Sequence, residues 1–229
     1  MRLSKKLNNS IWFQLILLIP LIFLLLVIMI QYEAVCNLGG VLREAVSLKT
    51  FVDDWIPFNI YIIYPYILCL FYLPILGIFY AFNRRISTIQ LVSFYFSAIF
   101  IYFVTYAIYL VFPTTANGVM ITSFNPVIMN DGMFRVLQNL YGSSTPLGDF
   151  PSLHVIPMVF ISLFLYKHWR SLFWMFLPFA VFGVSGTVLL KFHTFIGLLG
   201  GVAMGYFGYY ILYEKLIFKY FSKFLPATE

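Results

Sequence analysis

Residues 11–31 read IWFQLILLIPLIFLLLVIMIQ, an apolar run without a charged side chain. A stretch of about 20 apolar residues is long enough to cross the hydrocarbon core of a bilayer as a helix. Further apolar runs occupy roughly residues 58–82, 87–112, 152–168, 171–190 and 194–214. The sequence therefore predicts an all-α integral membrane protein in which residues 1–229 form a single membrane domain, a bundle of six transmembrane helices.

The overall composition supports this class. The chain is 62% hydrophobic and only 10% charged, with a mean hydropathy of +0.93, so it has too little charge for a soluble domain of its length. A basic start followed by an apolar run also resembles a secretory signal peptide. Residues 11–31 are too long for that and lack a small-residue cleavage pattern, so we expect a retained first span.

Basic residues predict the orientation. By the positive-inside rule, basic clusters mark the cytoplasmic side, which places both termini inside and the long segment between the third and fourth spans outside. We expect the cell membrane as the location and membrane lipids as partners. The net charge of +6 fits this orientation and an attraction to anionic lipid headgroups, and we do not expect nucleic-acid binding. The clusters are Arg2, Lys5 and Lys6; Arg84 and Arg85; Lys167 and Arg170; and Lys215, Lys219 and Lys223.

The outer segments carry most of the polar variety. Residues 113–150 are rich in Pro, Asn, Gly, Ser and Thr, and a connection of this length is usually functional or disordered. Within it, residues 131–141 predict a short amphipathic helix at the membrane interface, and a second such helix is expected around residues 42–51. Cys36 is placed in the first outer loop and Cys69 inside the second span, so we predict neither a disulfide nor a cysteine–histidine metal site.

The sequence Pro151-Ser152-Leu153-His154 precedes the fourth apolar run. Ser152 is predicted as the N-cap, with Leu153 and His154 in the first helical turn. Free amides at a helix start favour an anion such as phosphate, and His154 beside them is suited to donate or accept a proton. The plainer interpretation is that Ser152 only caps the helix while His154 reaches the interface.

A second histidine is expected at the same mouth. The fourth span leads inward from His154, and the fifth returns the chain outward to Lys191 and His193. Ionisable residues between apolar neighbours are costly in a membrane and are candidates for function. The alternative is that Lys191 extends to outer headgroups and His193 caps a helix end. His168 lies in the cytoplasmic turn and is interpreted as an interfacial residue.

Residues 150–154 and 187–193 resemble the second and third signature motifs of the type 2 phosphatidic acid phosphatase superfamily of membrane phosphatases and phosphotransferases. The nearest branch shares Pro-Ser-Leu-His and then a Thr, Lys, His pattern. Weaker similarities occur at residues 53–58 and at Pro113-Thr114, so the likeness covers roughly residues 50–215. The family also has six transmembrane helices.

The resemblance implies phosphoryl transfer through a phosphohistidine, without a metal or another cofactor. His193 would be the nucleophile that attacks a lipid-linked phosphate, and His154 would protonate the leaving oxygen and then activate water or an acceptor hydroxyl. Lys191, Thr187, Ser152 and the helix-start amides would hold the phosphate oxygens. The expected substrate is a polyprenyl, phosphatidyl or sphingolipid-type phosphate, at the outer membrane face.

Two departures from the family pattern stand out. The family places an Asp four residues after the nucleophilic histidine, to orient its ring, but this chain has Gly197 there. Asp149 and Asp131 are candidates to reach His193 instead. The family also has a basic first motif near the end of the third span, which is missing here, and Arg135 or Lys191 is a candidate replacement.

These departures leave three interpretations open. The first is an active phosphatase or phosphotransferase, in which Gly197→Asp is expected to raise turnover unless Gly197 serves helix packing. The second is a catalytically degenerate member that binds a lipid phosphate or a partner protein. The third is a small transporter or scaffold in which the histidines are incidental.

Overall fold

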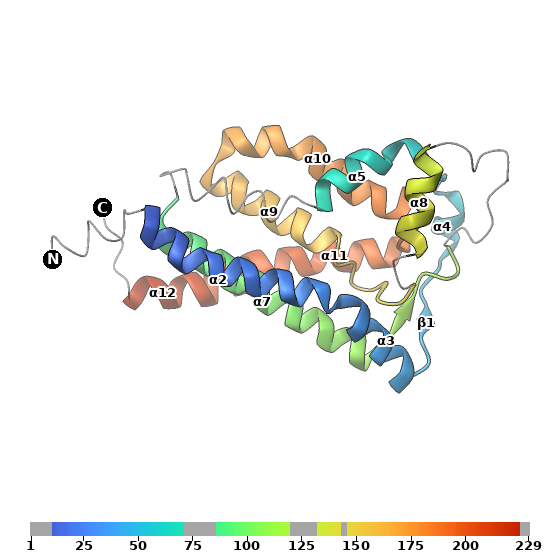
Figure 1. Cartoon of the computed structure of the whole chain (residues 1–229), viewed down its shortest axis with the longest axis horizontal. Coiled ribbons are helices and arrows are strands. Elements are labelled where there is room, and N and C mark those ends of the chain that lie inside the picture. The colour runs from blue at the N-terminus through green and yellow to red at the C-terminus, as the bar shows by residue number, and fades with distance from the viewer. Residues whose placement is uncertain (1–10, 71–85, 120–131, 143–145, 225–229) are drawn as a thin grey trace.

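Long apolar helices run lengthwise through the molecule, and shorter elements close one end of it (Figure 1). The computed structural model describes residues 11–70, 86–119, 132–142 and 146–224, and these residues are mostly helical. The α-helices are α2 (Ile11–Ile30), α3 (Tyr32–Leu42), α4 (Phe51–Trp55), α5 (Ile63–Leu70), α7 (Thr88–Val111), α8 (Gly132–Gly142), α9 (Val155–His168), α10 (Arg170–Leu189), α11 (Phe195–Phe207) and α12 (Lys219–Phe224). The other elements are strands β1 (Val46–Ser47) and β2 (Thr114–Thr115), the 3₁₀ turn η1 (Ile60–Ile62) and the π-helical segment η3 (Gly208–Phe218).

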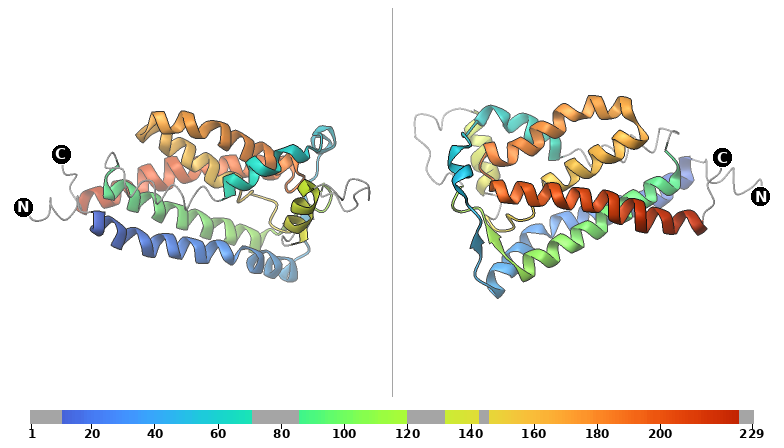
Figure 2. Two further views of the ribbon diagram at one scale, coloured as in Figure 1. Left: turned by 45° about the horizontal axis from the view of Figure 1, so that its top comes forward. Right: turned by 180° about the vertical axis from the view of Figure 1, so that it is seen from behind.

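Among the described residues, three helices are long and apolar enough to cross a membrane: Thr88–Val111, Arg170–Leu189 and the continuous stretch Phe195–Lys223 (Figure 2). A fourth candidate is the pair Leu18–Ile30 and Tyr32–Leu42, which is bent by 40°. The expected helices over residues 87–112 and 171–190 are confirmed to within one residue at each end. Residues 71–82 of the second predicted span lie outside the described residues.

The fourth predicted span is shorter than expected. Its helix, α9, begins at Val155 rather than at residue 152 and has 14 residues. At a rise of 1.5 Å per residue it is about 21 Å long, less than the roughly 30 Å core of a bilayer. The longer helices α7 and α10, with 24 and 20 residues, do reach that thickness.

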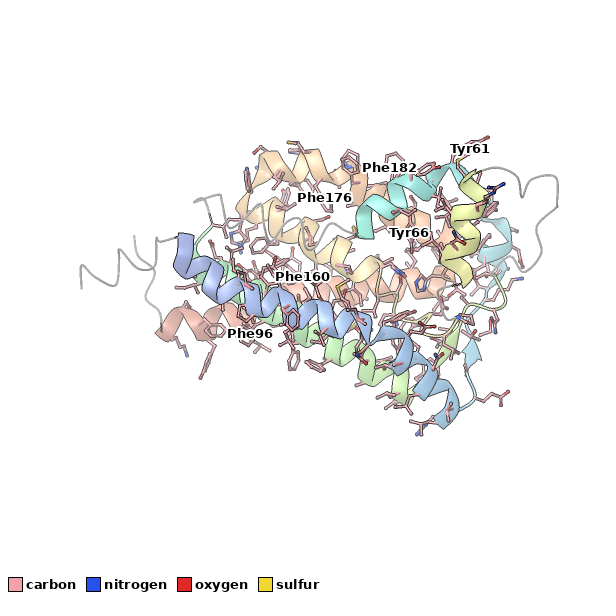
Figure 3. All side chains as sticks on the ribbon, in the orientation of Figure 1. Tyr61, Tyr66, Phe96, Phe160, Phe176 and Phe182 are labelled. Carbon is pink, nitrogen blue, oxygen red and sulfur yellow. The ribbon has the colours of Figure 1, made fainter. Side chains whose placement is uncertain are left out.

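The core is aromatic and aliphatic. Helix α7 packs on α2, α3 and η3, while α9 packs between α10 and α11 and α5 covers α10. Tyr66, Phe160 and Phe176 are buried among these helices, whereas Phe96 and Phe182 lie on the outside (Figure 3). Apolar side chains are exposed along α7 and α10, as expected where helices face lipid rather than water.

The segment after α2 differs from expectation. Cys36, expected in a loop, is instead buried in α3. Helix α3 continues α2 after the bend. The prediction of an amphipathic helix around residues 42–51 is wrong. Helix α3 ends at Leu42, and the chain then extends into β1. Strand β1 pairs in parallel with β2, with Val46 opposite Thr114, and two-residue pairing of this kind leaves no local signal in the sequence. The helix expected over residues 131–141 is confirmed as α8.

Candidate active site

The two predicted histidines meet at the closed end of the molecule. His154 immediately precedes α9, and His193 lies in the turn between α10 and α11. The Nδ1 atom of His154 is 2.9 Å from Nε2 of His193, within hydrogen-bonding distance. His193 is 4% exposed, and His154 is partly buried. The two rings therefore meet edge-on, nitrogen to nitrogen, at a largely buried position.

The turn that carries His193 is shaped by Thr187 and Lys191. The amides of Phe192 and His193 both donate to the carbonyl oxygen of Thr187, at 2.9 and 3.0 Å. Lys191 has φ of 60°, the left-handed conformation that commonly ends helices and that usually falls to glycine. Its ammonium donates to the carbonyl oxygens of Asp53 and Ile56, at 2.8 and 2.7 Å. These bonds hold a strained residue in place and fix the direction of the chain into His193.

Asp149 is the group behind His193. Nδ1 of His193 lies 3.1 Å from the carbonyl oxygen of Asp149 and 3.3 Å from its Oδ1. The Asp149 carboxylate also accepts from the backbone N–H of Thr194 at 2.8 Å and from its hydroxyl at 2.5 Å. Asp149 is one of the two carboxylates named as replacements for the family aspartate. The other, Asp131, lies outside the described residues.

Asp149 sets the tautomer of His193 through its backbone carbonyl oxygen and its carboxylate together. Burial raises the pKa of the Asp149 carboxyl, but the hydrogen bonds and charge of His193 and the bonds from Thr194 outweigh it and hold the pKa below its usual value. Asp149 is thus ionised, and both oxygens near Nδ1 of His193 are acceptors. We assign the proton of the neutral ring to Nδ1, which leaves the Nε2 lone pair directed at His154.

The loop that presents Asp149 is anchored on the β2 segment. Thr114 accepts from Gly148 through its carbonyl oxygen at 2.9 Å and from the amide of Phe150 through Oγ1 at 2.8 Å. The hydroxyl of Tyr109 donates to the carbonyl oxygen of Pro151 at 2.6 Å. The Pro113-Thr114 similarity noted in the sequence thus supplies a support for the loop rather than a contact to the histidines.

Gly148 makes this loop possible. Its φ is +78°, and a Cβ there would lie 2.5 Å from Sγ of Cys36. We expect Gly148→Ala to destabilise the protein by about 1–3 kcal/mol, because it combines a strained backbone with a collision. Thermal unfolding in detergent measures the effect. Gly132→Ala is the control, since a Cβ at Gly132 meets no described residue within 4 Å, and equal stability of the two variants would contradict the prediction.

Gly197 is a site of close approach between two segments of the chain, α11 and the loop before α9. A Cβ on Gly197 would lie 2.5 Å from the carbonyl oxygen of Asp149 and 2.6 Å from its Oδ1, and the carbonyl oxygen of Gly197 accepts from the amide of Ser152. Asp149 therefore stands where a side chain at residue 197 would begin. The carboxylate near His193 thus comes from the loop before α9 and not from α11.

This contact reverses the expectation that Gly197→Asp raises turnover. The new side chain would displace Asp149 and place a second negative charge beside it, so we expect a loss of stability of about 3 kcal/mol or more. Gly132→Asp, at the open start of α8, is the matched control and should be close to neutral. Comparison of the two melting temperatures is the measurement. A Gly197→Asp protein as stable as its parent would show that the contact is absent.

The amino end of α11 is already occupied by carboxylates. Thr194 is its N-cap and accepts from the amide of Gly197 at 3.1 Å. Asp149 binds the amide of Thr194, and Oδ1 of Asp53 accepts from the amide of Phe195 at 2.6 Å. Asp53 and Asp149 thus take the place at this helix start where an external anion would otherwise be favoured.

The amino end of α9 is arranged differently. The prediction that Ser152 caps this helix through its side chain is wrong, because His154 is the N-cap residue and Oγ of Ser152 is buried without a hydrogen-bond partner among the described residues. The carbonyl oxygen of Ser152 instead accepts from the amides of Val155 and Ile156. Within the described part of the chain, the amides of Leu153 and His154 have no acceptor. Unpaired donors therefore gather beside the histidine pair.

The other predicted phosphate ligands do not gather there. Lys191 is bound to the two carbonyl oxygens, and the hydroxyl of Thr187 donates to the carbonyl oxygen of Val184 at 2.7 Å. Arg135 is exposed on α8. Among the described residues, no lysine or arginine forms a hydrogen bond or ion pair with either histidine. Thr187 and Lys191 act on the site through the position of the turn.

Sequence reasoning missed one aromatic residue of the site. Tyr66, on α5 (Figure 3), is buried. Its ring stacks on Phe192 with centroids 5.4 Å apart and lies 5.7 Å from the ring of His154. A Cβ on Gly186 would lie 2.9 Å from the Tyr66 ring, so α10 approaches it closely. Tyr66 limits the space into which His154 can turn, and an apolar run gives no signal for such a contact.

No group of three or more His, Cys, Asp or Glu side chains that could hold a metal ion occurs among the described residues. Compared with models of known protein families, with curated proteins and with solved structures, the chain matches none of them. A function for the site is therefore inferred from its own residues and their geometry.

Proposed function

We propose that the chain is a membrane phosphatase or phosphotransferase that acts on a lipid-linked phosphate through a phosphohistidine intermediate. The observation that carries the proposal is the alignment of Asp149, His193 and His154. A carboxylate orients one imidazole, and the free nitrogen of that imidazole faces a second imidazole at 2.9 Å. A nucleophile, its orienting group and an acid or base within reach are the parts that covalent phosphoryl transfer requires.

In the proposed reaction, Nε2 of His193 attacks phosphorus while the bond to the leaving oxygen breaks. Burial and the neighbouring His193 lower the pKa of His154 to about 3, and the negative charge of a bound phosphate opposes this shift and favours the protonated ring. The protonated His154 gives the leaving oxygen its proton. Asp149 stabilises the positive charge on His193 through Nδ1–H. The neutral His154 then takes a proton from water or an acceptor hydroxyl, whose oxygen attacks phosphorus, and the N–P bond breaks to restore His193.

Substrate must separate the two rings. A phosphorus atom with its oxygens cannot fit between nitrogens 2.9 Å apart, so His154 turns away from His193 on binding. The unpaired amides of Leu153 and His154 and the buried Oγ of Ser152 are the donors available to the phosphate oxygens. Pre-arranged donors of this type stabilise developing negative charge in a site shielded from water.

The proposal includes the membrane arrangement predicted from sequence: six spans, both termini in the cytoplasm and the histidines at the outer face of the cell membrane. The apolar helices and their exposed aromatic and aliphatic faces support a membrane location. The opposite ends of α9 support the orientation, since the histidine pair lies at one end while Lys167, Lys215 and Lys219 gather at the other. The motif resemblance supports assignment to the type 2 phosphatidic acid phosphatase superfamily.

The test is release of phosphate by the purified full chain from phosphatidate, a polyprenyl diphosphate and a sphingoid-base phosphate. Release that depends on His154 and His193 supports the proposal. His168→Ala, which replaces a histidine at the other end of α9, is the matched control and should retain activity. If no substrate of this panel is turned over, and an acceptor alcohol does not restore transfer, the enzymatic proposal fails.

A catalytically degenerate protein is the second candidate, and one observation favours it. The cation that the family places near the phosphate has no equivalent in contact with the described histidines, because Lys191 is held by carbonyl oxygens. Such a protein would bind a lipid phosphate without turnover. Saturable binding of phosphatidate, abolished by His154→Ala and unaccompanied by phosphate release, would select this candidate.

A further inference from the structure

A second polar pocket lies at the far end of α9 from the histidine pair. It has a volume of about 600 Å³ and is formed by the end of α9, η3 and the start of α12. The 14 residues of α9 place it about 20 Å from His154. Its polar lining consists of Lys167, His168, Tyr213, Glu214, Lys215 and Lys219.

The pocket carries excess positive charge. Lys167 forms an ion pair with Glu214, so three lysines face a single carboxylate in the lining. In the part of the chain that the structure describes, Lys215 and Lys219 form no ion pair or hydrogen bond through their side chains. They lie four residues apart, about one helical turn, and both are exposed. Two positive charges thus point at the pocket without a counter-charge.

One wall of the pocket is fixed by hydrogen bonds. The side-chain amide of Gln90 donates to Nδ1 of His168 at 3.1 Å, so Nε2 of His168 carries the proton and donates to the Tyr213 hydroxyl, also at 3.1 Å. Because Tyr213 accepts this bond, its own hydroxyl proton remains available to another acceptor. The wall therefore adds a neutral donor to the lysines. Tyr213 belongs to η3, a π-helical segment, and such segments occur frequently at functional sites.

The surroundings indicate where a ligand comes from. Trp174 and Tyr220 are exposed at this end, and the guanidinium of Arg170 lies 4.8 Å from the centroid of the Tyr166 ring. Aromatic residues mixed with basic ones mark the level of lipid headgroups at the end of transmembrane helices. Phe218 adds an apolar side to the pocket.

We propose that this pocket binds the phosphate of an anionic membrane lipid, with Lys215 and Lys219 as its main contacts and Lys167 and Tyr213 as additional donors. The site is separate from the histidine pair and does not depend on the proposed catalytic activity. An anionic phosphodiester headgroup fits because its negative charge offsets the excess positive charge of the lining, and its acyl chains remain in the bilayer beside the apolar helices.

The test uses the full chain in detergent and measures binding of phosphatidylglycerol, phosphatidylcholine and inorganic phosphate by native mass spectrometry and thermal shift. We expect phosphatidylglycerol to bind at least several-fold more tightly than phosphatidylcholine. The double variant Lys215→Gln and Lys219→Gln should lower that preference by about tenfold. Lys223→Gln, on the same helix but outside the pocket lining, should change it less than twofold, and His193→Ala should leave it intact.

Four results would overturn the proposal: equal binding of the two lipids, an equal effect of Lys223→Gln, loss of the preference in His193→Ala, or inorganic phosphate that binds as tightly as phosphatidylglycerol and competes with it. The fourth would assign the pocket to free phosphate instead. Melting temperatures without lipid separate a binding defect from a folding defect, because both Gln substitutions are at exposed positions and should leave the fold unchanged.

Discussion

Replacing His193 with Ala should lower phosphate release from a lipid phosphate by about 10⁴-fold or more, because the variant has no nitrogen to form the covalent intermediate. His154→Ala should cost about 10²–10⁴-fold, the usual contribution of a positioned acid or base. Initial rates of phosphate release with a saturating substrate measure both effects. The ring of His168 is hydrogen-bonded to Gln90 and Tyr213. The rate of phosphate release by His168→Ala should therefore stay within a few-fold of the parent rate.

The comparison of the three histidine variants is informative because each replaces the same residue type. If His193→Ala and His168→Ala had equal activity, His193 would not be the nucleophile. If both were inactive and also unfolded, melting temperatures would show it, and His193→Gln, which keeps more of the volume of the ring, would take its place.

Asp149→Asn should reduce the turnover number by about 10³–10⁴-fold while leaving KM within a few-fold. The substitution keeps the shape of the side chain but removes its charge and allows its amide to donate to Nδ1 of His193, which favours the wrong tautomer. Nε2 of His193 would then carry the proton and have no lone pair for attack on phosphorus. This effect depends on the contact of Oδ1 of Asp149 with Nδ1 of His193 at 3.3 Å, since the substitution leaves the backbone carbonyl oxygen at 3.1 Å unchanged.

A purely structural role for Asp149 would give another pattern, since it also binds Thr194 and the start of α11. Loss of stability alone lowers the amount of folded enzyme without a selective loss of turnover. Nitrogen-15 chemical shifts of the histidine rings provide a readout that stability does not move, because the tautomer of His193 should change in Asp149→Asn. Asp54→Asn, at an exposed carboxylate that pairs with Lys49, should change neither turnover nor tautomer.

The sequence is sufficient to predict the long helices and the proximity of the two histidines. Helices α7 and α10 follow apolar runs whose ends are marked by polar or basic residues, and the alternation of spans predicts that residues 154 and 193 lie at one end. The predicted start of α9 at residue 152 rests on the expectation that the hydroxyl of Ser152 caps the helix. In the structure that hydroxyl has no partner among the described residues, and it is the carbonyl oxygen of Ser152 that accepts from the first amides of α9. A cap is a local rule, and here packing against Gly197 decides the geometry.

The sequence indicates two candidates, Asp149 and Asp131, for the carboxylate that orients His193, but it does not show which of them does so. Asp149 reaches His193 because β2 holds the loop and because Gly197 leaves room for it, and both conditions are contacts between segments far apart in the chain. Lys191 was expected at the phosphate because it is charged and near His193. Its left-handed backbone directs the side chain to the carbonyl oxygens of Asp53 and Ile56, which no pattern of neighbouring residues indicates.

The most direct test of the proposed mechanism is detection of a phosphoryl group on the enzyme. The full chain is mixed briefly with a lipid phosphate, quenched in alkali, which preserves phosphohistidine, and analysed by peptide mass spectrometry. A phosphoryl group on His193, absent from His193→Ala and reduced in Asp149→Asn, is the predicted result. Phosphate release without any modified histidine, or a phosphoryl group on another residue, would contradict the assignment of His193 as the nucleophile.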